Sequence, residues 1–119
     1  MIAAALSLFL ASSSVLVTDG DTIRLGSEPV RIVGYDSPEI RHAKCPAERA
    51  MGQYDKDLLR ELLAGGFEYQ RLGTDRWGRT LARIWVNGTD VARIMTSRGN
   101  AVPYICKGGR CPKRKDWCG

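Results

Sequence analysis

Apolar and polar residues alternate in several short segments of the chain, a pattern typical of strands that bury one face. β-branched and aromatic residues are concentrated in these segments, and Gly, Asp, Asn and Pro separate them. The pattern predicts strands at residues 15–17, 22–25, 30–35, 67–72 and 80–86. The first two are expected to join through Asp19-Gly20-Asp21, since Asp-Gly favours a turn.

Two segments have the signals of helices. The first begins after Cys45, where Pro46 fits the first helical turn, and ends at Gly65-Gly66. The second covers residues 91–98, after a cap at Asp90. Apolar residues of the first helix recur at spacings of three and four, which predicts a buried face. These residues are Ala47, Met51, Tyr54, Leu58 and Leu62.

The predicted order is three strands, a helix, two strands and a second short helix. This order is typical of the OB-fold, a five-stranded barrel with an inserted helix, so the class is mainly β with helices (α+β). A chain of 119 residues is long enough for one such core. We expect an apolar segment at 1–13, the barrel domain at 14–105 and a tail at 106–119.

The N-terminal segment, MIAAALSLFLASSS, resembles the hydrophobic part of a signal peptide with small residues at 11–13. It lacks a Lys or Arg before the apolar run, and it is too short for a stable membrane anchor. We expect export, so that the protein is secreted or periplasmic. The alternative is a short apolar strand or helix that packs on the domain.

The chain contains four cysteines: Cys45, Cys106, Cys111 and Cys118. An even number in a small chain favours two disulfides and an oxidising compartment, although three pairings are possible. Reduced thiols and a metal site are the alternatives. The C-x4-C-x6-C spacing matches structural zinc sites poorly.

Positive charge is concentrated in the tail. The whole chain has a net charge of +5, and residues 106–119 carry five basic residues against one acidic residue. The tail is therefore either a solvated segment or an arm that attracts phosphates. A basic balance favours polyanionic partners but does not identify them.

Carboxylates follow two of the predicted strands. Asp19 and Asp21 end the first strand, and Asp36 and Glu39 follow the third. If these strands are neighbours, the carboxylates converge at one rim of the barrel, where their mutual repulsion would destabilise the fold. A divalent cation would remove that repulsion, and oxygen ligands of this kind suit Ca²⁺ or Mg²⁺. The alternative is that the aspartates only cap a turn.

Two arginines complete the pattern. Arg31 lies on the third strand, and Arg79 follows the loop that contains Trp77. A guanidinium can bind two phosphate oxygens at once and stays charged at any working pH. Two arginines facing a carboxylate-bound cation would form a phosphate clamp, and Glu39 would then be free to act on water. A salt bridge to a neighbouring strand is the alternative for Arg31.

Three segments, VTDGDTIRL, VRIVGYDSPE and DRWGRTLARI, resemble the three signature blocks of the staphylococcal nuclease (thermonuclease) family, in the same order. The resemblance covers residues 15–104. Two departures are visible: Ser37 replaces a common Thr, and a short cysteine-containing tail stands where the family has a longer helical segment. The resemblance implies an OB-fold that hydrolyses DNA and RNA with Ca²⁺ and low sequence specificity and leaves 3′-phosphate ends.

The resemblance also implies roles for single residues. The Ca²⁺ ligands would be the carboxylates of Asp21 and Asp36 and the backbone carbonyl of Ser37, with Asp19 supporting the site.

For the reaction, the resemblance implies that Glu39 is the general-base candidate, while Arg31 and Arg79 bind the phosphate and stabilise the developing charge. The positions that match the surroundings of the nucleotide are Arg76, Trp77 and Tyr104. For Trp77, a loop anchor or core residue is an equal alternative to base stacking.

Two other functions compete with the enzyme. One is an OB-fold module that binds nucleic acid without cutting it, and the other is a disulfide-stapled interaction domain whose acids are structural. Degenerate family members usually lose an acid or an arginine of the clamp, and this chain keeps the full set. We therefore expect an active nuclease that works as a monomer with DNA and RNA as substrates.

Overall fold

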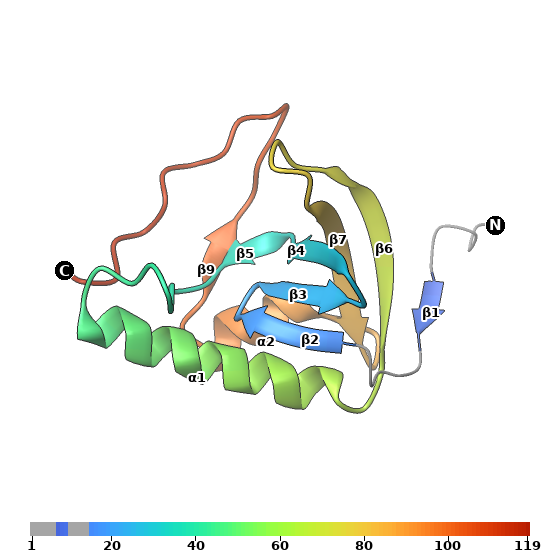
Figure 1. Ribbon diagram of the computed structural model, residues 1–119, viewed down its shortest axis with the longest axis horizontal. Coiled ribbons are helices and arrows are strands. Elements are labelled where there is room, and N and C mark those ends of the chain that lie inside the picture. The colour runs from blue at the N-terminus through green and yellow to red at the C-terminus, as the bar shows by residue number, and fades with distance from the viewer. Residues whose placement is uncertain (1–6, 10–14) are drawn as a thin grey trace.

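The structure is a computed structural model that describes residues 7–9 and 15–119. Two helices and a set of short strands make up the fold (Figure 1). The helices are α1 (Pro46–Leu63) and α2 (Val91–Arg98). The strands are β1 (Ser7–Phe9), β2 (Val15–Asp19), β3 (Thr22–Leu25), β4 (Glu28–Ile32), β5 (Gly34–Asp36), β6 (Phe67–Thr74), β7 (Thr80–Val86), β8 (Thr89–Asp90) and β9 (Val102–Tyr104).

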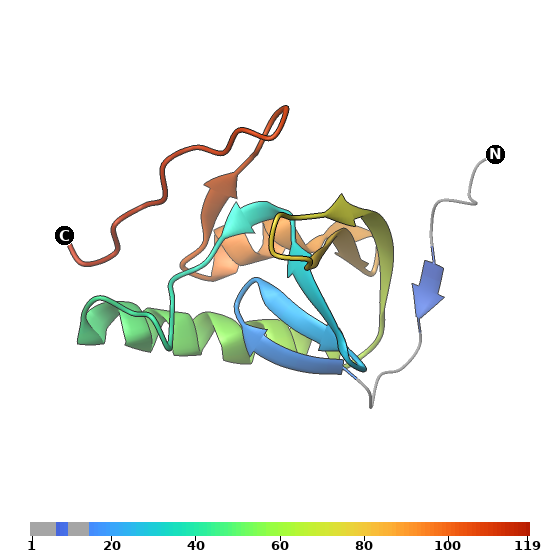
Figure 2. The same ribbon diagram turned by 45° about the horizontal axis from the view of Figure 1, so that its top comes forward.

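Most strands form one curved sheet in the order β1-β6-β7-β4-β3-β2, with β8 added to β7. Neighbours pair antiparallel except β4 and β7, which are parallel. Strands β5 and β9 form a separate two-stranded sheet. Figure 2 shows α1 running along β2 and β3, and α2 contacts α1, β7 and the pair formed by β5 and β9. The predicted α+β class, with a helix inserted between strands, is confirmed.

The third predicted strand, 30–35, is divided in the structure. The chain leaves the edge of β7 after Ile32, and Val33 donates its last bond there, to the carbonyl of Ala82. Gly34 has a φ of +102°, a backbone conformation that glycine adopts without steric cost. This turn redirects the chain so that β5 pairs with β9. It thereby places Asp36 away from the main sheet.

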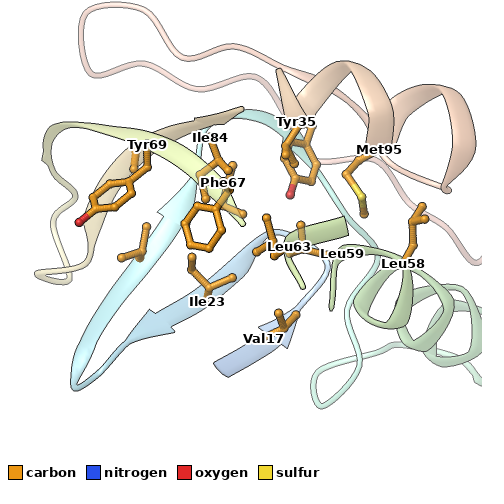
Figure 3. Close-up of a cluster of buried hydrophobic side chains, with 14 of the residues drawn as sticks. Val17, Ile23, Tyr35, Leu58, Leu59, Leu63, Phe67, Tyr69, Ile84 and Met95 are labelled. Atoms are coloured by element: carbon orange, nitrogen blue, oxygen red, sulfur yellow. The ribbon is translucent and has the colours of Figure 1, made fainter. Parts of the chain in front are cut away.

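The core lies between the curved sheet and the two helices. Figure 3 shows apolar side chains from β3, β6, β7 and α1 converging there, among them Ile23, Ile84 and Leu59, which are fully buried. Tyr35 is also buried, and its hydroxyl donates to the carbonyl of Gly20 at 2.7 Å. The core therefore reaches directly under the turn that carries the aspartates.

The predicted buried face of α1 is wrong in detail. Ala47 is exposed, and so is Tyr54, which keeps 57% of its surface accessible. Met51 and Leu62 are half-buried, and only Leu58 is buried as predicted. The residues that α1 buries are Glu48, Gly52, Asp55, Leu58, Leu59 and Leu63.

Polar packing explains the shifted face of α1. A Cβ atom at Gly52 would lie 2.6 Å from the carbonyl oxygen of Glu39, so the helix passes too close to that loop for any side chain. Asp55 is fully buried and accepts hydrogen bonds from the Ser37 hydroxyl and from Asn100. The first half of α1 thus packs on the loop after β5 through small and polar residues, which apolar spacing does not reveal.

All four cysteines are paired, which confirms the prediction of disulfides. Cys45 is bonded to Cys118, 73 residues later, and Cys106 is bonded to Cys111. The tail runs from β9 back to the beginning of α1 (Figures 1 and 2).

The N-terminal segment is described only in part. Strand β1 pairs antiparallel with β6, as the alternative of a packed strand expected. The residues with signal-peptide cleavage options, 11–13, lie outside the described residues. Within the described part of the chain, no helix is long and apolar enough to cross a membrane.

Candidate functional site

The site is built on the turn between β2 and β3 and on the end of β5. Glycine is required between the two aspartates, because a Cβ atom at Gly20 would lie 2.2 Å from the Ser37 hydroxyl oxygen. The Ser37 backbone N–H donates to Asp21 Oδ2 at 3.0 Å and joins the two segments. Asp21, Asp36 and Ser37 are all buried. The predicted convergence of the carboxylates is therefore present.

Arg31 holds the two carboxylates together. Its Nη2 lies 3.4 Å from Asp21 Oδ2 and 3.3 Å from Asp36 Oδ1. Its Nη1 donates to the backbone carbonyl of Tyr35 at 3.1 Å, which fixes the direction of the guanidinium. Thr22, the partner of Arg31 across β3 and β4, donates its hydroxyl to Asp21 Oδ1. One arginine thus faces both predicted cation ligands.

Two of the four carboxylates at this rim (Asp19, Asp21, Asp36 and Glu39) have raised pKa values. Burial, together with the nearby carboxylates of Asp21 and Glu39, raises the pKa of Asp19 from 3.8 to about 6. Burial also raises the pKa of Asp36, although the guanidinium of Arg114 opposes this. Raised carboxylate pKa values in such a cluster are typical of functional sites.

The oxygen atoms at this rim fit a hard divalent cation. The two carboxylates of Asp21 and Asp36 approach the same nitrogen of Arg31, and the carbonyl of Ser37 belongs to the residue directly after Asp36. In residues 7–9 and 15–119, no group of three His, Cys, Asp or Glu side chains is arranged to hold a metal. Two carboxylates completed by a backbone carbonyl and water suit Ca²⁺ and do not suit zinc.

Arg79, the second predicted clamp residue, is held by Asp75 in the structure. Its Nε donates to Asp75 Oδ2 at 2.7 Å, and its backbone N–H donates to Asp75 Oδ1 at 2.9 Å. Asp75 also accepts from the backbone N–H of Trp77, which shapes the loop. The structure thus joins Arg31 to the carboxylates but pairs Arg79 with Asp75. Sequence reasoning did not single out Asp75, although its place before the arginine in the loop was a usable signal.

The predicted substrate-binding residues lie at two places. Trp77 is 69% exposed, and the guanidinium groups of Arg76 and Arg79 lie 4.5 and 5.6 Å from its ring centroid. Trp77 is therefore not a core residue. Tyr104 instead contacts the tail, because its hydroxyl donates to the carbonyl of Pro112 at 2.9 Å.

The tail adds a residue that sequence reasoning missed. Arg114 Nε donates to Asp36 Oδ2 at 2.9 Å, and its Nη2 reaches Asp36 Oδ1 at 3.1 Å and Glu39 Oε2 at 2.8 Å. Only the high basic content of the tail signalled such a contact, and it did not indicate which residue would make it.

A comparison of sequences gives the family. The family profile described as "Staphylococcal nuclease homologue" matches residues 29–117, which is most of the chain. The chain belongs to the staphylococcal nuclease family. Membership confirms the predicted OB-fold and the resemblance drawn from the sequence blocks.

Two curated thermonucleases are similar to this staphylococcal nuclease homologue. The thermonuclease of Staphylococcus intermedius is 35% identical over 77 aligned positions, which cover 59% of this chain and 45% of the relative. The thermonuclease of Staphylococcus hyicus is 32% identical over 79 positions, covering 60% of this chain and 46% of the relative. The chain thus spans less than half of each of these relatives.

The family match and the site overlap incompletely. The match begins in β4, so it contains Arg31, Asp36 and Arg79 but leaves out Asp19 and Asp21. It continues through the tail to residue 117, beyond the limit at residue 104 that the signature blocks had set. The tail of this staphylococcal nuclease homologue is therefore inside the region of family likeness.

Proposed function

We propose that this protein is a Ca²⁺-dependent nuclease that hydrolyses the phosphodiester backbone of DNA and RNA and leaves 3′-phosphate ends. The observation that carries the proposal is the convergence of buried Asp21 and Asp36 on one guanidinium nitrogen of Arg31. Family membership and the two thermonuclease relatives support the same reaction.

The cation would be held by the carboxylates of Asp21 and Asp36 and the backbone carbonyl of Ser37. Bound there, it would polarise a phosphate oxygen and help to neutralise the charge that develops on it. Asp19 would add negative charge beside these ligands, since its pKa is raised by burial and by the nearby carboxylates of Asp21 and Glu39. The rim is therefore suited to gain stability when a cation binds.

The side chains around the cation would bind the phosphate and move the proton. Arg31 is anchored by backbone carbonyls and remains charged, so it can donate to a phosphate oxygen. Asp75 holds Nε of Arg79 and orients its guanidinium. Glu39 is the carboxylate that would accept a proton from the attacking water, because its side chain is partly exposed.

Substrate selection would depend mainly on the backbone of the nucleic acid. Phosphate contacts position a protein on nucleic acid but carry no base information, so low sequence specificity is expected. The exposed Trp77, flanked by Arg76, offers a surface on which any base can stack. The two disulfides favour work in an oxidising compartment, in agreement with export.

A non-catalytic nucleic-acid-binding module is the second candidate. Arg114 favours it, because its guanidinium forms ion pairs with both Asp36 and Glu39. In such a module the arginine would replace the cation permanently.

The two candidates differ in what they do to an oligonucleotide. We would incubate a 5′-labelled single-stranded DNA and its RNA equivalent with the protein and Ca²⁺, then treat the products with a phosphatase. The nuclease should give shortened products whose mobility the phosphatase changes, because a 3′-phosphate is removed. Bound but intact oligonucleotide would favour the binding module.

A further inference from the structure

The tail places a guanidinium on the carboxylates that the proposed function assigns to cation and catalysis. Arg114 donates to both oxygens of Asp36, and the same Nη2 reaches Glu39. Asp36 is only 2% exposed, whereas the Arg114 side chain is 46% exposed. The arginine therefore covers Asp36 from the solvent side.

A covalent anchor lies four residues beyond this arginine. Cys118 is bonded to Cys45, immediately before α1. Trp117 is 8% exposed, and its indole N–H donates to the carbonyl of Asn100 at 3.4 Å. These contacts hold residues 112–118 across the site and keep the guanidinium at high local concentration beside Asp36. The tail thus crosses the site as a covalently anchored segment, and Arg114 is the residue through which it contacts the site.

Arg114 and a divalent cation cannot use Asp36 in the same way at the same time. Oδ2 of Asp36 accepts from Arg114, and Oδ1 faces both Arg114 and Arg31. A cation bound to Asp36 needs one of these oxygens, and Arg114, unlike Arg31, donates to both of them. Occupation by Arg114 and occupation by a cation are therefore competing states.

We propose that Arg114, held by the Cys45–Cys118 disulfide, is an internal counter-cation that occupies Asp36 and Glu39 and must leave before a divalent cation binds. This inference rests on the proposed function, because it concerns the same carboxylates. It adds a residue of the tail to the site and makes cation binding depend on how the tail is held. Coupling of this kind commonly changes an affinity about 5- to 150-fold.

The test is Ca²⁺ binding by isothermal titration calorimetry on the oxidised full chain, without nucleic acid. Arg114→Ala should bind Ca²⁺ about tenfold more tightly than the wild type, because the competitor is gone. Lys115→Ala is the matched control, since it removes the same charge from the neighbouring exposed position. An equal gain in both variants, or weaker binding by Arg114→Ala, would overturn the proposal.

The anchor is tested with the double variant Cys45→Ser/Cys118→Ser. Serine keeps an acceptor at the N-cap of α1, where Cys45 Sγ accepts from the Glu48 N–H. Releasing the tail should raise Ca²⁺ affinity toward that of Arg114→Ala, and adding Arg114→Ala should then change it less than about twofold. An unchanged affinity on release would refute the role of the disulfide. If the serine variant fails to fold, the Arg114→Ala comparison decides alone.

The outcomes also separate this inference from the proposed function. Ca²⁺ binding that is equally tight in the wild type and in Arg114→Ala, with DNA cleavage retained, would overturn only the competition. Absence of Ca²⁺ binding in every variant would overturn both the competition and the assigned cation site.

Discussion

The pKa values of the carboxyl groups at the rim differ from those of carboxyl groups elsewhere in the fold. At the rim, burial and neighbouring acids raise the pKa of Asp19 to about 6, and burial raises that of Asp36. At the start of β4, Glu28 accepts hydrogen bonds from Arg71 and Thr80, and these lower its pKa to about 2. Hydrogen-bond donors thus outweigh burial at Glu28, whereas burial is the dominant cause of the raised pKa values of Asp19 and Asp36.

The difference separates acids that stabilise the fold from acids that we propose to take part in cation binding and catalysis. Glu48 is buried, yet its carboxylate accepts from the backbone N–H groups of Lys44 and Glu39. Burial alone would raise its pKa, but these hydrogen bonds lower it below its ordinary value. Acids with such partners contribute to folding. At Asp19 and Asp36 burial raises the pKa and nearby carboxylates add to it, and such perturbed acids are typical of functional sites.

The largest effect is expected at Glu39. Glu39→Gln should lower the rate of DNA cleavage by about 10²- to 10⁴-fold, because the general base is lost. Its free energy of unfolding should change little, since the carboxylate is partly exposed. Single-turnover cleavage and denaturant unfolding measure the two quantities, with the exposed Glu61→Gln as control. Cleavage close to the wild-type rate would remove Glu39 from the reaction.

The second-largest effect is expected when an arginine of the proposed phosphate clamp is replaced. Arg31→Ala and Arg79→Ala should each lower the cleavage rate at least about 10²-fold, because a donor to the developing charge is lost. Arg24→Ala is the matched control, as the exposed Arg24 lies on β3 and donates to the carbonyl of Ser27. Activity within tenfold of the wild type in both variants would contradict the clamp.

Glu48 tests the prediction that a buried acid with hydrogen-bond partners stabilises the fold. Glu48→Gln replaces one acceptor oxygen by an NH₂ group that faces a backbone N–H, so a buried donor loses its partner. The free energy of unfolding should fall by about 2 kcal/mol. Urea unfolding of this variant and of Glu61→Gln provides the measurement. An unchanged stability would show that the partners of Glu48 do not stabilise the fold.

Asp19 is expected to destabilise the fold when its carboxyl group is ionised. Because its folded pKa is about 6 and its ordinary value is 3.8, the folded protein binds this proton more tightly than the unfolded chain. Ionised Asp19 thus destabilises the fold above pH 6, and this penalty fades as the pH falls from 6 toward 4. In EGTA at pH 7.5, Asp19→Asn should raise the free energy of unfolding by about 1 kcal/mol. A gain that persists at pH 4 would point to another cause.

The smallest effect is expected at Glu28, with the opposite dependence on pH. Its folded pKa of about 2 lies below its ordinary 4.5, so its contribution is present above pH 4.5 and is lost as the pH falls toward 2. Glu28→Gln should lower the free energy of unfolding by about 0.5 kcal/mol at pH 7, as expected for a partly exposed pair. The loss should vanish near pH 2. If it grew on acidification, the assignment of Glu28 as a stabilising acid would be wrong.

Much of the rim could be predicted because its residues lie at strand ends. Alternating positions located β2, β3, β6 and β7, and the acids at the first turn and after the third strand were expected to meet. Arg31 was expected on the third strand and Asp36 directly after it, and the two side chains do contact each other. Local chain geometry determines these contacts, so the sequence contains the information.

Contacts that depend on distant packing could not be predicted. The buried face of α1 was misplaced because Gly52 and Asp55 pack on a loop through backbone approach and hydrogen bonds. Arg114 was missed because its position depends on a disulfide between residues 73 apart, which was one of three possible pairings. Apolar periodicity carries no signal for either contact.

The central claim is that the rim binds a cation and cuts nucleic acid. The most direct measurement is cleavage of denatured DNA by the purified protein, in Ca²⁺ and again in excess EGTA, with Glu39→Gln alongside. We predict cleavage in Ca²⁺, none in EGTA and little with the variant. Cleavage that is equal in Ca²⁺ and EGTA would contradict the cation site, and intact DNA in both conditions would contradict the nuclease.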